Sequence, residues 1–138
     1  MLPQSNRIMV TDPDLTIIDE SGVPQRADSI PESWIAKSLN KYHLEFKYQT
    51  SWRGGRSVPG GIVIDFIVYG GITTALEYAG IYWHSRGVNE TLKWAVLARE
   101  FDRLLIFSDE PMPWLGVWAA TDVVIDQESS DQAVAKHF

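Results

Sequence analysis

The sequence predicts an α/β (α+β) fold in which helices pack on a mixed sheet of about four strands. Three observations lead to this fold class. Two segments have the apolar periodicity of helices, four short segments have the composition of strands, and their order is helix, three strands, helix, strand. At 138 residues the chain has the length of one domain with a single hydrophobic core.

The first helix is expected near residues 29–42. Ser29 and Glu32 have the spacing of a capping box, and Pro31 lies in the first helical turn. Residues 1–28 before it are polar with one short apolar stretch, so we expect an arm with at most one short strand. The apolar stripe of the helix consists of Trp34, Ile35, Leu39 and Tyr42.

Three strands follow the first helix. Residues 43–49 alternate between apolar and polar side chains, which is typical of a strand with one solvated face. Residues 62–68 are β-branched or aromatic except for one carboxylate, and residues 73–79 return after a tight glycine turn. A glycine-rich loop, residues 51–61, separates the first of these strands from the second.

The second half of the chain begins with another helix. Ser85 or Asn89 can cap it, and it ends near Phe101; its apolar residues cover more than one face, which indicates burial. Residues 103–107 are a further strand, residues 115–125 fit helix or strand, and the tail forms a short helix at best. We therefore divide the chain into an N-terminal arm (1–28), a core (29–110) and a C-terminal extension (111–138).

The composition excludes several classes of protein. No apolar run approaches the roughly 20 residues of a membrane span, and the N-terminus lacks the apolar segment of a signal peptide. Because the chain has no cysteine, disulfides, thiolate zinc sites and cysteine nucleophiles are excluded. A cytoplasmic protein without a membrane partner is the expectation.

The net charge of −6 is unevenly distributed along the chain. Residues 1–32 and 100–138 have balances of −4 and −6, whereas residues 33–99 have a balance of +4. A basic middle between acidic ends is compatible with one basic face that meets phosphates. An ordinary acidic protein whose charged residues happen to be unevenly placed along the chain has the same balances.

Two carboxylates in the hairpin point to chemistry. Asp65 lies inside an apolar strand, where an ionised carboxylate is costly unless it is paired or bound to a metal. If the turn is centred near Gly71, Glu77 is the antiparallel partner of Asp65, with Cβ atoms roughly 5 Å apart. Like charges at that distance favour a bound cation or a shared proton, and oxygen ligands suit Mg²⁺ or Mn²⁺.

An alternative places the same pair in solvent. Asp65 would then lie near the exposed end of its strand and Glu77 would be hydrated, with the pairing register shifted by one residue. The sequence by itself leaves both arrangements open.

Five other residues near the hairpin are candidates. His84 follows the second strand of the hairpin, where a loop can return it as a base or phosphate contact. Arg53 and Arg56 lie in the glycine-rich loop and can hold a phosphate backbone. Trp52 can stack on bases, and Glu32 is a catalytic candidate besides its capping role. Packing for the aromatic rings and solubility for the arginines are the ordinary explanations.

Five short segments between residues 30 and 107 together resemble a known family, because they occur in the same order. They are P-E-S-W-I (31–35), Y-Q (48–49), G-G-R (54–56), G-G-I-V-I-D-F (60–66) and A-L-E-Y-A-G-I-Y-W-H (75–84). In these segments the chain resembles small phage and bacterial proteins of the very-short-patch-repair-like branch of the PD-(D/E)XK nuclease superfamily.

The resemblance implies a restriction-endonuclease-like mixed sheet flanked by helices, and phosphodiester hydrolysis that depends on a divalent metal. It gives Asp65 and Glu77 the two acidic positions that bind the metal, His84 the role of a base and Glu32 that of the acid on the first helix. The chain departs from the pattern at Ala79, where the superfamily has Lys or often Gln or Asp. It also lacks the cysteine-containing zinc site of the mismatch-repair nickases, so mismatch recognition is not implied.

From these observations we expect a Mg²⁺- or Mn²⁺-dependent DNA endonuclease or nickase in a bacterial or phage-infected cell. One alternative is a degenerate nuclease fold that acts as a structural or interaction protein of a phage-type assembly, which the missing lysine at Ala79 favours. Another is a nucleic-acid-binding protein without catalysis, whose binding would depend on salt but not on a chelator.

Overall fold

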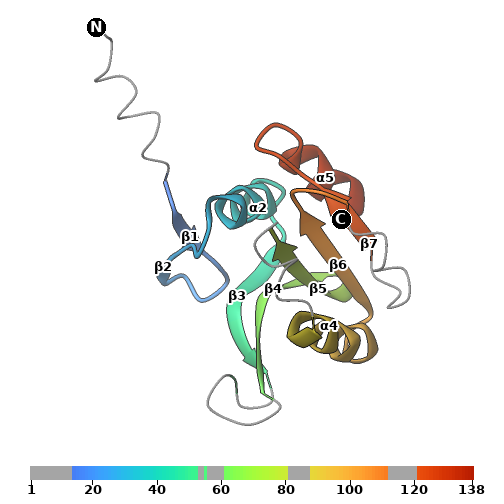
Figure 1. Cartoon of the computed structure of the whole chain (residues 1–138). Coiled ribbons are helices and arrows are strands. Elements are labelled where there is room, and N and C mark those ends of the chain that lie inside the picture. Colours follow the sequence, from blue (N-terminus) through green and yellow to red (C-terminus); the bar gives the residue numbers. More distant parts are fainter. Residues whose placement is uncertain (1–13, 53–54, 56–60, 81–87, 112–120) are drawn as a thin grey trace, which may run out of the picture.

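The computed structural model describes residues 14–52, 55, 61–80, 88–111 and 121–138. Its main sheet has five strands in the order β3-β4-β5-β6-β7 (Figure 1). The first three are antiparallel, and β6 and β7 extend the sheet parallel to β5. The expected fold class is confirmed, with five strands where about four were expected. They are β3 (Glu45–Trp52), β4 (Ile62–Gly70), β5 (Ile72–Ala79), β6 (Arg103–Ser108) and β7 (Thr121–Val124).

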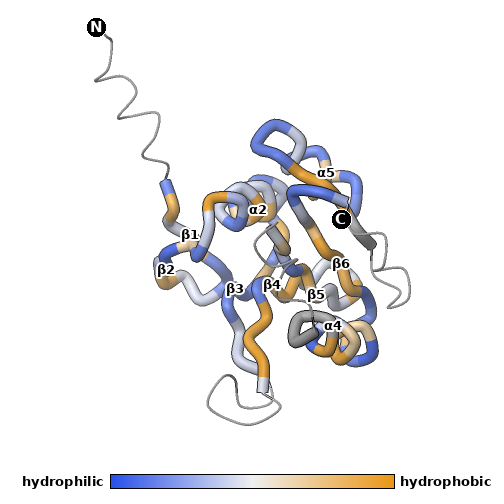
Figure 2. The backbone as a smooth tube through the Cα atoms, viewed as in Figure 1, coloured by the Kyte–Doolittle hydropathy of each residue, from blue (hydrophilic) through white to orange (hydrophobic). Residues whose placement is uncertain are grey.

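Helices cover both faces of this sheet. α2 (Ile30–Lys41) and α5 (Ser130–His137) pack on one face, and α4 (Val88–Glu100), which connects β5 to β6, packs on the other. A helical crossover of this kind is the usual way to join parallel strands. Figure 2 shows that hydrophobic residues follow β4 and β6, as expected of strands covered on both faces.

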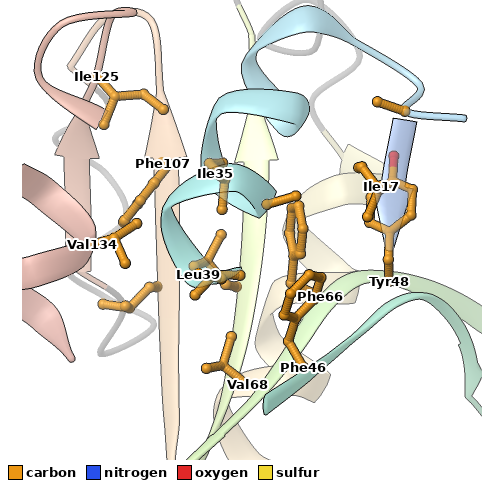
Figure 3. Close-up of a cluster of buried hydrophobic side chains, with 14 residues drawn as sticks. Ile17, Ile35, Leu39, Phe46, Tyr48, Phe66, Val68, Phe107, Ile125 and Val134 are labelled. Atoms are coloured by element: carbon orange, nitrogen blue, oxygen red, sulfur yellow. The ribbon is translucent and has the colours of Figure 1, made fainter. Parts of the chain in front are cut away.

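Each face has its own cluster of buried side chains. In the first, Ile35 and Leu39 of α2 lie against the aromatic side chains of β3 and β4 (Figure 3). We call it the α2 cluster; it comprises Ile17, Ala27, Ile35, Ala36, Leu39, Phe46, Tyr48, Phe66, Val68, Leu76, Leu105, Phe107, Ile125 and Val134. The α4 cluster on the opposite face comprises Ile64, Ile67, Ala75, Ala79, Trp94, Leu97, Phe101, Leu104 and Ile106.

The C-terminal extension contributes to the core. The ambiguous segment at residues 115–125 contains strand β7, while residues 112–120 lie outside the described part of the chain. The tail forms α5, a helix of 8 residues whose Val134 is fully buried in the α2 cluster. Within the described residues, no helix is both long and apolar enough to cross a membrane.

The start of α2 confirms the capping signal. The Ser29 hydroxyl accepts a hydrogen bond from the backbone N–H of Glu32 at 3.3 Å and donates to the Glu32 carboxylate at 2.7 Å. In a standard capping box the glutamate accepts from the backbone N–H of the cap residue. Here it accepts from the hydroxyl through Oε2, and its other oxygen, Oε1, accepts from the strand side chains described below.

The expectation of at most one strand before α2 was wrong. The chain forms a two-stranded antiparallel hairpin from β1 (Thr16–Ile18) and β2 (Pro24–Arg26). A strand of three residues is too short to show an alternating pattern, and β2 consists of Pro, Gln and Arg, so its pairing with β1 rather than its composition specifies it. Ile17 is 1% exposed within the α2 cluster, and the Asp19 carboxylate accepts the backbone N–H of Tyr48 at 2.8 Å.

Replacing Asp19 by Ala is expected to destabilise the fold by about 1 kcal/mol, because the Tyr48 N–H loses its acceptor. Burial acts to raise the pKa of Asp19, but hydrogen bonds from Ser21, Tyr48 and Gln25 outweigh it and lower the pKa below 3.8. The stabilisation is therefore present above the unfolded-state pKa and is lost as the pH falls through the folded-state pKa. Urea unfolding at pH 7 and in the acid range checks this, with the exposed Glu128→Ala as control.

Candidate active site

The ladder between β4 and β5 ends at two carboxylates. Backbone pairing runs from Gly70 with Ile72 to Phe66 with Leu76, which is the register expected from the turn. The next pair in this register is Asp65 with Glu77, so the shifted register is excluded. At this point side chains take over the backbone donors: the Asp65 N–H donates to Glu77 Oε2 at 2.8 Å.

The opposite bond completes the exchange between the strands. The backbone N–H of Tyr78 donates to Asp65 Oδ2 at 3.0 Å. Each strand therefore supplies a carboxylate that satisfies an N–H of the other strand, in place of a carbonyl. The carboxylates lie side by side as expected, and backbone dipoles partly compensate their charge.

The regular pleat of β3 and β4 is interrupted next to this pair. Tyr48 and Phe66 pack in the α2 cluster, whereas Trp52 and Ile64 pack with the α4 cluster. Residues at even spacing in a strand normally share one face, so each strand changes face between these positions. Gln49 lies at the change and has φ of +55°, a left-handed conformation that is uncommon for residues other than glycine.

Gln49 uses this conformation to bridge two acidic residues. Its side-chain nitrogen Nε2 lies 3.3 Å from Asp65 Oδ1 and 3.5 Å from Glu32 Oε1. The amide therefore connects the N-terminal turn of α2 with the middle of β4. A strained backbone maintained at a polar centre is often functional.

Glu32 is buried at 6% exposure and belongs to the same network. Burial raises the pKa of its carboxyl group, and the charges of Asp28 and Glu77 act in the same direction. Hydrogen bonds from the hydroxyl groups of Tyr48 at 2.6 Å and Ser29 at 2.7 Å oppose this shift by stabilising the ionised form.

A lysine from α4 completes the centre. Lys93 Nζ lies 2.6 Å from Glu77 Oε1, with the two side chains 15% and 3% exposed. The hairpin pattern gives no hint of Lys93, because it is distant in sequence from both acids. The one sequence signal for Lys93 is its position four residues before Leu97, which places both side chains on the same face of α4. That face is the buried one, because Leu97 is fully buried whereas Leu92 is 61% exposed.

Negative charge exceeds positive charge among the described groups of this centre. Burial raises the pKa of Asp65 well above its usual value, and the charge of Glu77 adds to the effect. Lys93 opposes this increase, and the charge of Glu32 adds to it. One ammonium therefore faces three carboxyl groups, which favours either a proton on one of them or a further cation.

The remaining sequence candidates lie elsewhere in the fold or outside the described residues. Arg53, Arg56 and His84 are in segments outside the described part of the chain. Trp52 is half-buried at the end of β3, where its ring packs on Phe101 at 5.0 Å and its Nε1 donates to a carboxylate of α4 at 2.8 Å. These contacts attach the end of the β3–β4 pair at Trp52 to α4.

The carboxylates of Asp65 and Glu77 limit which metal ions this centre suits. Among the described residues no three His, Cys, Asp or Glu side chains converge closely enough to hold a metal ion. Mg²⁺ commonly keeps several waters and uses one or two carboxylates together with substrate phosphates. The chemistry of Asp65 and Glu77, two neighbouring carboxylates that lack full charge balance, fits this kind of site.

Comparisons with family models, with curated proteins and with solved structures found no match to this chain.

Proposed function

We propose that this chain is a divalent-metal-dependent DNA endonuclease or nickase of the PD-(D/E)XK type, similar to the very-short-patch-repair-like branch. The observation that supports this most is the meeting of Asp65, Glu77 and Lys93 in one partly closed centre. Acidic metal ligands beside an ammonium group are the elements that hydrolysis of a phosphodiester requires. The resemblance of the ordered sequence segments points to the same chemistry.

Asp65 and Glu77 would hold Mg²⁺ or Mn²⁺. The bound cation would supply Lewis-acid polarisation of the phosphate and a more acidic water. Lys93 supplies the positive charge that Ala79 cannot, because α4 brings its ammonium group to Glu77 on the face of the sheet where Ala79 is buried. An ammonium group at this place stabilises the charge that develops on the phosphate oxygens.

Other residues of the chain orient the ligands. In the metal-free chain Gln49 holds Asp65 Oδ1, and backbone N–H groups hold the second oxygen of each carboxylate. Glu32 holds the Gln49 amide and anchors the network to α2. His84 as a proton-transfer group, and Arg53 and Arg56 as backbone contacts, remain predictions of the sequence.

A structural role in an assembly is the second candidate. The observation that favours it is that the four carboxylate oxygens of Asp65 and Glu77 already have donors within the protein. A network closed in this way can fix the position of α4 without a cation.

A plasmid-nicking assay distinguishes the nuclease from the structural role. With Mg²⁺ or Mn²⁺ the wild-type chain is expected to convert supercoiled plasmid to open-circular or linear forms, and EDTA is expected to stop the reaction. Absence of cleavage across a series of divalent metals, with folded protein in excess, would support the structural role instead. Binding that survives EDTA but weakens with salt would indicate a nucleic-acid-binding protein without catalysis.

A further inference from the structure

The four carboxylate oxygens of Asp65 and Glu77 have two kinds of partners. One oxygen of each carboxylate accepts from a backbone N–H: Asp65 Oδ2 from Tyr78 at 3.0 Å, and Glu77 Oε2 from Asp65 at 2.8 Å. The other oxygen of each accepts from a side chain. Gln49 Nε2 lies 3.3 Å from Asp65 Oδ1, and Lys93 Nζ lies 2.6 Å from Glu77 Oε1.

These two kinds of partners differ in how easily they can leave. The backbone donors belong to β4 and β5, so their release would pull the sheet apart. The side-chain donors end flexible chains that can rotate away without disturbing a strand. Asp65 Oδ1 and Glu77 Oε1 are therefore the two oxygens that the protein can free for another ligand.

We propose that Lys93 and Gln49 hold the metal-binding oxygens of Glu77 and Asp65 until a divalent cation exchanges with them. This inference rests on the proposed function, because it concerns the same site. The displaced ammonium of Lys93 then remains beside the bound metal, where an anionic group of a ligand can pair with it. A phosphodiester bound at the metal carries such an anionic group, which couples metal binding to nucleic-acid binding.

The exchange has a consequence for metal affinity. A cation that enters the wild-type site must displace an ammonium group and remain close to it, so like charges oppose binding. A neutral side chain at position 93 removes this opposition. We expect Lys93→Gln to bind Mn²⁺ about 10-fold more tightly than the wild type, a coupling of ordinary size. Gln can still donate a hydrogen bond to Glu77, which limits the loss of stability.

The test is a Mn²⁺ titration of the full chain, followed by the electron paramagnetic resonance signal of free Mn²⁺. The wild type, Lys93→Gln and Lys41→Gln are compared, the last as a control whose ammonium pairs with Asp131 on the surface at 2.7 Å. Tighter binding by Lys93→Gln alone supports the exchange. Equal or weaker binding by folded Lys93→Gln, checked by circular dichroism, overturns it.

A second measurement adds nucleic acid to the same Mn²⁺ titration. A short phosphorothioate duplex that resists cleavage should raise the Mn²⁺ affinity of the wild type about 10-fold, because it accepts the displaced ammonium. Lys93→Gln should lose most of this increase. Absence of the increase in the wild type overturns the exchange.

Failure of the exchange and failure of the nuclease proposal give different results. Metal-dependent cleavage without any gain of affinity in Lys93→Gln overturns the exchange and leaves the enzyme. Tighter Mn²⁺ binding by Lys93→Gln without cleavage by the wild type overturns the enzyme and supports the exchange. Absence of Mn²⁺ binding in both proteins overturns both proposals.

Discussion

Replacing Asp65 by Asn is expected to reduce cleavage at least about 100-fold, the effect of removing one group that stabilises the transition state. Asn keeps the shape of the side chain and can still accept from the Tyr78 N–H, so the strand contact at 3.0 Å is preserved. It cannot supply the negative charge that a divalent cation requires. Initial rates of plasmid nicking at saturating Mg²⁺ measure the loss.

The same substitution is expected to stabilise the fold by about 1 kcal/mol, as active-site replacements often do. The pKa of Asp65 is raised by burial and by Glu77, which shows that its charge is unfavourable in the folded protein. Asp131→Asn, at the surface ion pair with Lys41, serves as the matched control for activity, with cleavage close to that of the wild type. Undiminished cleavage by Asp65→Asn would remove Asp65 from the mechanism.

Replacing Lys93 by Met is expected to cost about 3–5 kcal/mol of folding free energy, the usual effect of removing one partner of a buried ion pair. Met fills much of the volume of the lysine side chain but leaves Glu77, whose side chain is 3% exposed, without its ammonium partner. Cleavage should fall as well, because the centre loses its described positive charge. Urea unfolding followed by tryptophan fluorescence measures the stability.

The chain contains a matched control for this lysine. Lys41 pairs with Asp131 at 2.7 Å, close to the 2.6 Å of the buried pair, but its side chain is 62% exposed. Water screens this surface pair, so Lys41→Met should leave stability nearly unchanged. Equal effects of the two substitutions would show that burial does not determine the contribution of Lys93.

The sequence predicted those parts of the fold that depend on local pattern. The α2 cap followed from Ser29 and Glu32, and the pairing of Asp65 with Glu77 was the first of the two registers that the sequence left open. Both are short-range features, because a cap is set within one turn and a tight hairpin fixes its own register.

The remainder of the site depended on long-range contacts. Lys93 reaches Glu77 only because α4 crosses over the sheet, and the sequence pattern of a helix does not reveal its partner. The bridge from Gln49 depends on an unusual backbone angle that no propensity predicts. The second short strand before α2, Pro24–Arg26, was missed for the same reason: its pairing with β1, rather than its composition, specifies it.

The boundary between the α2 cluster and the α4 cluster passes through the acidic centre. Glu32 comes from the helix of one cluster and Lys93 from the helix of the other, while Gln49 and Asp65 lie where β3 and β4 change faces. A molecule that has consolidated only one half of its core therefore has no assembled centre. If the chain cuts DNA, it can do so only after both halves of its core have packed.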